Sequence, residues 1–327
     1  MKKILITGGA GFIGYHLSKI LSEDTKNEVN IIDDFSQGKN DEFFKELIKK
    51  DNVNFYKMDL TDLDTYSKID TEYDQIYHLA AIVGVRRVEE NPDLTLRVNA
   101  LSTIYLLEYI KKMRNKPKLL FSSSCENYAG SIKVCNVKVP TPENVPLCIE
   151  DINNPRWSYA VSKILGECAC INYSKKFGFG SVVVRYHNIY GPRMGTHHVI
   201  PELIFRIIKR KNPFPIYGGK QYRTFCYIDD AVKMTINVMN NSKDNLYNIG
   251  SDSNEILIED IAKMLFKISN YHPEIIEKGA PEGSINRRKA DLLKMKSEGL
   301  MVNEVNFKDG LEKTHHWYKK YFEDDTT

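Results

Sequence analysis

The 327-residue sequence contains no apolar run approaching the about 20 residues that a membrane-spanning helix needs. It also has no marked excess of one charge, because 46 Lys and Arg stand against 43 Asp and Glu, a net charge of +3. Proteins whose main partner is a nucleic acid or an anionic membrane are usually far more basic. We therefore expect neither a nucleic acid nor a membrane among the partners of this protein.

Cysteine pairs and metal-ligand spacings are absent as well. The six cysteines form no Cys-x-x-Cys motif and no zinc spacing, and their density is far below that of a disulfide scaffold. His197 and His198 are adjacent in the chain, which is not the helical spacing of metal ligands. We predict no metal site, and we expect most of the cysteine side chains to be small buried hydrophobes.

The N-terminus begins with a lysine pair and an apolar stretch, as secretion signals do. Its glycines come too early, however, and no small-residue cleavage site follows a full hydrophobic region. We interpret residues 3–8 as a first strand and predict a cytoplasmic protein.

Strand-like and helix-like segments alternate through the first half of the sequence. The predicted strands are residues 3–8, 29–33, 53–59, 74–81, 118–124 and 181–186. Such alternation implies right-handed βαβ crossovers, so we predict an α/β fold with a doubly wound parallel sheet. Beyond Arg185, loops rich in Gly and Pro separate short helices. These loops predict a smaller mixed α/β lid, with residues 225–232 returning to the sheet.

A glycine-rich loop follows the first predicted strand. Gly8, Gly11 and Gly14 form a G-x-x-G-x-x-G motif that permits a tight turn and brings backbone N–H groups close to a pyrophosphate. Asp33 ends the second strand 19 residues later, where a carboxylate binds ribose hydroxyls and repels a 2′-phosphate. With Asp34 beside it, this pattern predicts a Rossmann-type dinucleotide site that prefers NAD.

A tyrosine and a lysine lie four residues apart in a predicted helix. Tyr159 and Lys163 are therefore neighbours on its surface. An ammonium beside a phenol stabilises the phenolate and lowers its pKa from about 10, so such a tyrosine exchanges protons near neutral pH. Taken alone, this spacing is more typical of an ordinary surface pair.

Taken together with Ser122, Ser123 and Ser124 at the end of the fifth strand, these motifs resemble the extended short-chain dehydrogenase/reductases. Within that family the resemblance is to the nucleotide-sugar epimerases and dehydratases, and it covers about residues 3–290. The other matching segments are Asp59-Leu60, HLAA (78–81), Asn99, NIYGPR (188–193), HVIPELI (198–204), PIYGG (215–219) and RTFCYIDDAV (223–232).

The resemblance assigns roles to three residues. Tyr159 is expected to take the proton from a sugar hydroxyl, usually O4, and Ser124 to hydrogen-bond the same hydroxyl. Lys163 is expected to lower the pKa of the tyrosine and to hold the nicotinamide ribose. Hydride leaves the carbon only as negative charge develops on the hydroxyl oxygen. Hydrogen-bond donors that the fold already holds in position suit this chemistry.

The resemblance also implies two larger sets of contacts. The cofactor-binding residues are Gly8, Gly11, Phe12, Ile13, Gly14, Asp33, Asp34, Asp59, Leu60, Leu79, Ala80, Ala81, Asn99, Ser122, Tyr159, Lys163 and Tyr186. The substrate-binding residues are Val85, Ser124, Cys125, Glu126, His187, Asn188, His198, Val199, Pro215, Tyr217, Arg223 and Arg288, with Arg287 as a further anchor. We predict that residues 1–186, with about 223–250, form the NAD-binding Rossmann domain. Residues 187–222 and 251–327 are predicted to form the sugar-nucleotide-binding lid.

The residues after Ser124 bear on the fate of the oxidised sugar. In the family, dehydratases have Thr-Asp-Glu here, decarboxylases Thr-Ser-Glu, and simple 4-epimerases small or hydroxylic residues. This chain has Cys125 and Glu126. A thiol of pKa near about 8.5 is a poor acid for a leaving hydroxyl, which weakens dehydration. The stretch PRWSY (155–159) resembles some decarboxylases and keeps decarboxylation open.

We therefore predict NAD-dependent oxidation at C4 of a UDP- or GDP-linked sugar. The product is a 4-keto sugar nucleotide (a net 4-dehydrogenase) or its 4-epimer, for surface polysaccharide synthesis. The alternatives are a decarboxylase or a 4,6-dehydratase using Glu126, and more distantly a non-catalytic NAD-binding module. The family also implies a homodimer or higher oligomer, formed through residues 93–113 and the helix of Tyr159.

Overall fold

The computed structural model describes residues 1–70, 72–253, 255–280 and 283–324, and the chain forms two compact units. The first unit comprises Met1–Asn127, Asp151–Arg185 and Met234–Tyr247. The second comprises Tyr128–Glu150, Tyr186–Lys233 and the described residues from Asn248 onward. The assignment of cofactor and substrate binding to separate domains stays a prediction.

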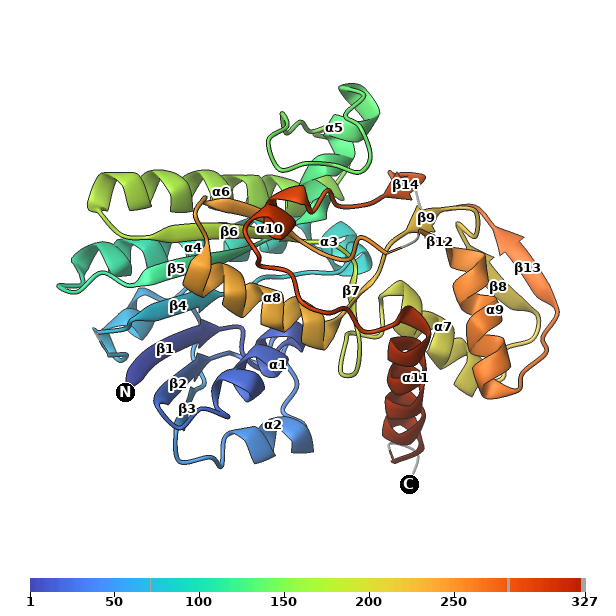
Figure 1. Cartoon of the computed structure of the whole chain (residues 1–327), viewed down its shortest axis with the longest axis horizontal. Coiled ribbons are helices and arrows are strands. Elements are labelled where there is room, and N and C mark those ends of the chain that lie inside the picture. The colour runs from blue at the N-terminus through green and yellow to red at the C-terminus, as the bar shows by residue number, and fades with distance from the viewer. Residues whose placement is uncertain (71, 254, 281–282, 325–327) are drawn as a thin grey trace. The chain divides into compact units, whose positions relative to one another are not determined.

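A seven-stranded sheet has the order β11-β6-β5-β4-β1-β2-β3 (Figure 1). Its strands are β1 (Lys2–Thr7), β2 (Asn27–Ile32), β3 (Val53–Tyr56), β4 (Gln75–His78), β5 (Lys118–Ser124), β6 (Ser181–Tyr186) and β11 (Leu246–Ile249). Strand β1 pairs in parallel with β2 and β4, as β2 does with β3 and β4 with β5. This strand order is that of dinucleotide-binding sheets. The predicted Rossmann-type parallel sheet is confirmed.

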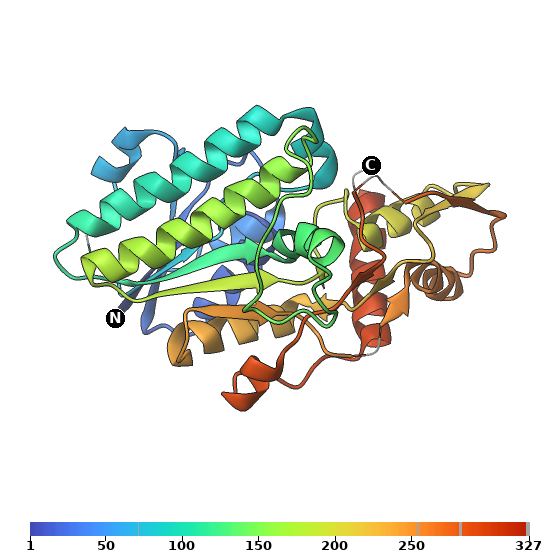
Figure 2. The same cartoon turned by 90° about the horizontal axis from the view of Figure 1, so that it is seen from above.

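Helices connect these strands and cover the sheet. They are α1 (Phe12–Leu21), α2 (Glu42–Leu47), η1 (Leu63–Ser67), α3 (Val85–Glu90), α4 (Pro92–Lys112), η2 (Cys125–Tyr128) and α6 (Trp157–Phe177). Helices α4 and α6 run side by side over one face of the sheet (Figure 2). Pro92 starts α4, where a missing N–H costs nothing, and Gly178 ends α6 with a φ of 71°. None of the helices among the described residues has the length and apolar character that crossing a membrane requires.

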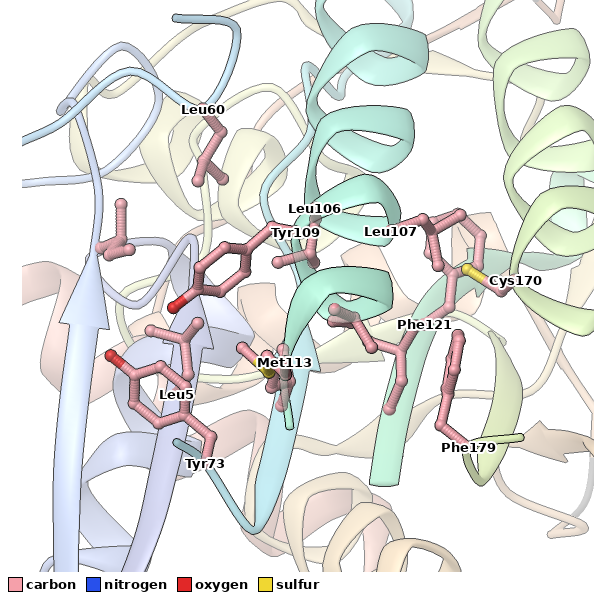
Figure 3. Close-up of a cluster of buried hydrophobic side chains, with 14 of the residues drawn as sticks. Leu5, Leu60, Tyr73, Leu106, Leu107, Tyr109, Met113, Phe121, Cys170 and Phe179 are labelled. Atoms are coloured by element: carbon pink, nitrogen blue, oxygen red, sulfur yellow. The ribbon is translucent and has the colours of Figure 1, made fainter. Parts of the chain in front are cut away.

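One core cluster of the first unit lies between the sheet and α4 and α6 (Figure 3). Leu5 of β1 and Leu119 of β5 are fully buried, as are Leu107 and Ile110 of α4. Parallel strands that are covered on both faces bury the side chains of both faces, so their sequences are nearly continuous apolar runs. This packing holds the carboxyl ends of β1, β4 and β5 in place, where the predicted site residues follow.

The remaining elements form three small sheets and several helices. They are α5 (Ala129–Val134), β7 (Ile189–Tyr190), α7 (Val199–Ile208), β8 (Phe214–Tyr217), β9 (Tyr222–Arg223), β10 (Cys226–Tyr227), α8 (Ile228–Asn241), β12 (Ile256–Leu257), α9 (Ile258–Ser269), β13 (Ile275–Lys278), β14 (Arg287–Arg288), α10 (Leu293–Ser297) and α11 (Phe307–Asp324). The small sheets pair β10 with β7, β9 with β12 and β14, and β13 with β8.

The prediction that residues 225–232 return to the central sheet is wrong. Strand β10 pairs with β7, and α8 begins directly after it at Ile228. Asp229 and Asp230 lie in the first turn of α8, where acidic side chains favour a helix start. The seventh strand of the central sheet is instead β11, which the sequence pattern did not predict.

Candidate active site

The glycine loop between β1 and α1 leaves no room for side chains. Gly8 has a φ of +74°, and a Cβ there would lie 2.7 Å from the backbone nitrogen of Ala80. A Cβ on Gly14 would lie 2.1 Å from the carbonyl oxygen of Gly8. Gly11 caps α1 without a side-chain hydrogen bond. No side chain of these glycines fills the space beside the start of α1, where helix N–H groups bind pyrophosphate in dinucleotide-binding folds.

Replacing Gly14 by Ala is expected to lower the affinity for NAD, the predicted cofactor, by at least about tenfold. The added methyl group overlaps the Gly8 carbonyl, so the loop must shift away from the geometry that receives a pyrophosphate. Calorimetric titration with NAD measures the change. Gly279→Ala is the matched control, because a Cβ there has no atom within 4 Å. Equal affinities in the two variants would contradict this role of the loop.

Asp33 lies beside the glycine loop and is only 8% exposed. Its carboxylate accepts hydrogen bonds from the backbone N–H of Ala10 at 3.0 Å and of Phe35 at 2.8 Å. Asp34 is exposed and accepts from the N–H of Ser36. Asp33 is therefore the carboxylate that β2 and the loop hold in place, and it fits the predicted ribose contact.

Other predicted cofactor residues lie in α1, after β3, after β4 and in α4, and one more belongs to the second unit. Phe12 and Ile13 form the first turn of α1, and Asp59 and Leu60 follow β3. Leu79, Ala80 and Ala81 follow β4 and are half-buried. Asn99 accepts from the N–H of Ile82 at 2.7 Å and donates to Ser162 Oγ at 3.1 Å, so it ties α4 and α6 to the segment after β4. Tyr186 is buried and belongs to the second unit.

The structure brings the three predicted catalytic residues together. Ser124 ends β5, and its side chain is hydrogen-bonded to that of Tyr159 on α6. Lys163, one turn further along α6, donates through Nζ to the carbonyl oxygen of Ser122 at 2.8 Å. The same Nζ lies 5.8 Å from the centre of the Tyr159 ring. A hydroxyl, a phenol and an ammonium therefore share one end of the sheet.

The pKa values of this group are set mainly by burial. Burial raises the pKa of Tyr159 above its usual value, Glu126 and Cys125 add to the rise, and the hydrogen bond from Ser124 opposes it. Burial lowers the pKa of Lys163 to about 8. The expected lowering of the phenol pKa by the lysine is therefore not met here, because desolvation is the largest influence on that pKa.

The residues after Ser124 include a charged pair that the sequence did not reveal. Cys125 is buried, at 4% exposure, whereas Glu126 is half-buried. Arg156 Nη2 lies 3.5 Å from Glu126 Oε2. The backbone N–H of Glu126 donates to Ser124 Oγ at 3.2 Å. The sequence drew attention to the Pro-Arg-Trp stretch at the start of α6, but its spacing did not indicate that Arg156 pairs with Glu126.

A second, fully buried ion pair lies next to these residues. Arg185 of β6 donates to Glu167 of α6 through Nε at 2.8 Å and through Nη2 at 2.5 Å. Ser123 also donates to Glu167, and Asn127 donates to it at 2.8 Å. Ser123 and Asn127 flank the stretch from Ser124 to Glu126, so this network holds that stretch against α6.

Two buried arginines of the second unit lie on neighbouring strands. Arg223 of β9 and Arg288 of β14 are paired in parallel register and are 9% and 8% exposed. Arg223 Nη2 donates to Gln221 Oε1 at 3.0 Å and to the carbonyl oxygen of Ile285 at 2.8 Å. Buried guanidinium groups so placed suit an anionic ligand with more than one charge. Arg287 is exposed and pairs with Glu255 at 2.7 Å, and its role as a further anchor stays a prediction.

His187 and Asn188 face other groups of the second unit. His187 is 1% exposed, and its Nε2 lies 3.2 Å from Asn248 Oδ1. Asn188 has a φ of 43° and donates to the carbonyl oxygen of Thr224 at 2.9 Å. Both side chains thus have structural partners, and their predicted contacts with substrate stay predictions.

The segment around Pro215 and Tyr217 borders a cavity of about 400 Å³ in the second unit. Arg206 of α7 donates to the carbonyl oxygen of Pro215 at 2.7 Å and lies 5.1 Å from the centre of the Tyr217 ring. The cavity is lined by Glu202, Phe205, Arg206, Lys209, Lys211, Pro215 and Tyr217. An exposed aromatic ring beside cationic side chains suits a planar, polar ligand.

The other substrate candidates lie at helix starts. His198 caps α7, and burial lowers its pKa to about 4, so it is neutral at pH 7. Val199 begins α7 and Val85 begins α3, and both are exposed. Within residues 1–70, 72–253, 255–280 and 283–324, no group of three or more His, Cys, Asp or Glu is placed to hold a metal ion.

Comparison with known proteins agrees with the resemblance seen in the sequence. Residues 4–250 match the NAD dependent epimerase/dehydratase family. The chain is 32% identical to a UDP-N-acetyl-alpha-D-glucosaminuronate decarboxylase of Bacillus cytotoxicus, covering 98% of both chains. It is 31% identical to a UDP-glucuronate 4-epimerase of Thermodesulfobacterium geofontis, over 98% of this chain and 97% of the relative.

Solved structures show the same fold. The UDP-glucose 4-epimerase of Thermotoga maritima with UDP-glucose superposes with a TM-score of 0.84 at 29% identity, covering 98% of this chain and 99% of that one. The UDP-glucuronic acid 4-epimerase of Bacillus cereus, in complex with UDP-glucuronic acid and NAD, has a TM-score of 0.81 at 30% identity and the same coverage. The glycine loop, Asp33 and the Ser124–Tyr159–Lys163 group fit NAD. The chain therefore belongs to the NAD-dependent epimerase/dehydratase family, and it is an enzyme whose cofactor is NAD.

Proposed function

We propose that this enzyme oxidises C4 of a UDP-linked sugar and returns the hydride to the opposite face, giving the 4-epimer. The observation that carries the proposal is the hydrogen bond between Ser124 and Tyr159, with Lys163 one turn further along α6. UDP is chosen because the 4-epimerases of Thermotoga maritima and Bacillus cereus were solved with UDP-sugars.

Each residue of the group has one task in this reaction. Tyr159 Oη takes the proton of the 4-hydroxyl and later gives it back, while Ser124 Oγ holds the same hydroxyl in place. Lys163, whose pKa lies near 8, is a cation at neutral pH and favours the phenolate, which offsets part of the rise in the Tyr159 pKa that burial causes. Bound NAD supplies the hydride acceptor. Lys163 is buried, and Ser124 and Tyr159 are half-buried. Preorganised charges act more strongly in such a site than in water.

The second unit supplies the proposed contacts with the nucleotide. Arg223 and Arg288 are two buried cations in register, a charge that matches a diphosphate. Pro215 and Tyr217 lie on β8 beside the cavity, and we assign them to the base. Asn188, His187, His198 and Val199 are the remaining proposed substrate contacts of this unit.

Decarboxylation is the second candidate, and the pair of Arg156 and Glu126 favours it. In a uronic acid, a ketone at C4 leaves the C6 carboxylate beta to the carbonyl, so carbon dioxide is lost readily. Arg156 is a cation 3.5 Å from Glu126, close to the Ser124–Tyr159 hydrogen bond, where it would attract a carboxylate. The decarboxylase of Bacillus cytotoxicus is among the relatives that match the full length of the chain.

Dehydration has less support. Loss of water needs an acid that protonates the leaving hydroxyl, and the residue after Ser124 is the buried thiol of Cys125. A thiol is a weaker acid than a carboxylic acid by about four pKa units, so it donates a proton reluctantly.

Product masses distinguish these reactions. The protein with NAD is incubated with UDP-, GDP-, CDP- and dTDP-linked sugars and uronic acids, and products are separated and weighed by mass spectrometry. We expect a UDP-sugar product of unchanged mass and altered retention time. Loss of carbon dioxide would establish the second candidate, loss of two hydrogens a net dehydrogenase, and loss of water a dehydratase. No product with any substrate would contradict all of these and favour a non-catalytic NAD-binding module.

We further propose a homodimer that acts in the cytoplasm, on a step toward surface polysaccharide. Helices α4 and α6 carry apolar side chains that their own unit does not cover fully, such as Leu96, Val161 and Leu165, which are 38%, 37% and 41% exposed. Light scattering of the purified protein measures the oligomeric state.

A further inference from the structure

Two cysteines that the proposed reaction does not use lie side by side in the second unit. Cys135 directly follows α5 and is exposed, and Cys148 is half-buried. Their sulfur atoms are 3.7 Å apart, although the residues are 13 positions apart in the sequence. The expectation that most cysteines are buried is therefore wrong for these two and for Cys168, which is also exposed.

The backbone, and not only the side chains, brings the two sulfurs together. A Cβ on Gly130 would lie 2.0 Å from the carbonyl oxygen of Cys148, so the segment before Glu150 lies directly against α5. The N–H of Cys148 donates to Ser131 Oγ at 3.2 Å, and Lys133 pairs with Glu150 at 2.9 Å. These contacts hold residues 148–150 against α5 beside the cysteine pair, and a disulfide requires the two sulfur atoms to approach from 3.7 Å to about 2 Å.

We propose that Cys135 and Cys148 form a modification site that reacts with low-molecular-weight disulfides and closes into an intramolecular disulfide. The Cys135 thiolate attacks one sulfur of the small disulfide, whose S–S bond breaks and releases one thiol. The Cys148 thiolate then attacks the Cys135 sulfur of the mixed disulfide and releases the second thiol. The two cysteines lose two electrons and two protons in total, and the small disulfide is reduced to two thiols.

The order of attack follows from exposure. Cys135 is open to solvent, whereas burial raises the pKa of the Cys148 thiol and leaves less of it as thiolate. Cys148 therefore acts second, when the mixed disulfide is held beside it and the attack is intramolecular.

The new bond closes a loop that supports a proposed substrate residue. Within this loop, Thr141 exchanges backbone hydrogen bonds with Lys289 and Asp291, at 2.9 and 3.0 Å. Glu143 accepts from the N–H of Asn248 at 2.9 Å, and Asn248 in turn contacts His187. Oxidation thus fastens the segment that holds Asn248 in place, and we expect it to raise the unfolding temperature.

Peptide mapping tests the proposal in the full-length protein. The protein is incubated with oxidised and reduced glutathione in varied ratio, remaining thiols are alkylated, and tryptic peptides are analysed by mass spectrometry. We expect the chain to lose two hydrogens and peptides 134–138 and 139–156, which carry the two cysteines, to become linked. Cys135→Ser and Cys148→Ser should both abolish the link, and Cys148→Ser should leave a glutathione adduct on Cys135. Cys168→Ser should behave as wild type.

A comparison with the unfolded chain decides whether the fold makes the site. The quantity compared is the ratio of oxidised to reduced glutathione at which half of the protein carries the Cys135–Cys148 disulfide. We expect this ratio to be at least about tenfold lower for the folded protein than for the protein in urea, because the fold raises the effective concentration of one thiol near the other. Glutathione adducts without the linked peptides would overturn the proposal, as would equal ratios in the folded and unfolded protein. Neither readout depends on which sugar the enzyme converts.

Discussion

Replacing Tyr159 by Phe is expected to lower kcat by about 10³-fold while NAD still binds. The substitution removes only the phenolic oxygen, which is hydrogen-bonded to Ser124 and is the proposed acceptor of the substrate proton. The ring remains to pack near Lys163, so the cofactor site keeps its shape. The measurement pairs the rate of product formation with a calorimetric titration of NAD.

Tyr173→Phe is the matched control for this prediction. Tyr173 lies on the same helix α6, and its hydroxyl donates to Glu108 at 2.8 Å, in a partly buried contact away from the catalytic group. We expect its kcat to stay close to that of the wild type. A Tyr159→Phe enzyme that retains more than about a tenth of the activity would show that another group takes the proton.

Replacing Glu167 by Ala is expected to lower the free energy of unfolding by about 3–5 kcal/mol, because it removes the carboxylate that pairs with the buried charge of Arg185. The side chains of Arg185 and Glu167 are 3% and 6% exposed. Ser123 and Asn127 lose their shared acceptor in the same variant. Urea unfolding without NAD measures the change. Ser123 and Asn127 flank the stretch from Ser124 to Glu126, which includes a proposed catalytic residue. We therefore also expect kcat to fall in this variant.

Glu46→Ala is the control for this prediction, because it removes an ion pair that is exposed to solvent instead of buried. Glu46 Oε1, on α2, lies 2.6 Å from Nζ of Lys49 just beyond the end of that helix, and both side chains are about two-thirds exposed. Solvent screens such a pair, so we expect no measurable change in unfolding. If Glu167→Ala unfolded at the same urea concentration as Glu46→Ala, the buried network would not be a source of stability.

Much of the fold and part of the site could be predicted from local patterns. Strands 118–124 and 181–186 were predicted with the bounds that the structure shows, since buried parallel strands read as apolar runs. Residues 225–232 were misplaced because a two-residue strand followed by a helix has no distinct pattern in sequence. Strand β11 has only four residues and follows closely after α8, so no separate apolar run marks it in the sequence.

The sequence by itself determined the α/β class, the glycine loop with Asp33, and the Tyr159–Lys163 pair. Each of these depends on residues within one or two adjacent elements, where spacing decides which side chains meet. Only the tertiary structure decided that Glu167 pairs with Arg185, Glu126 with Arg156, and Cys135 with Cys148. It also decided that the pKa of Tyr159 rises instead of falling. Pairing and desolvation depend on how separate elements pack, and packing has no signature in the spacing of one segment.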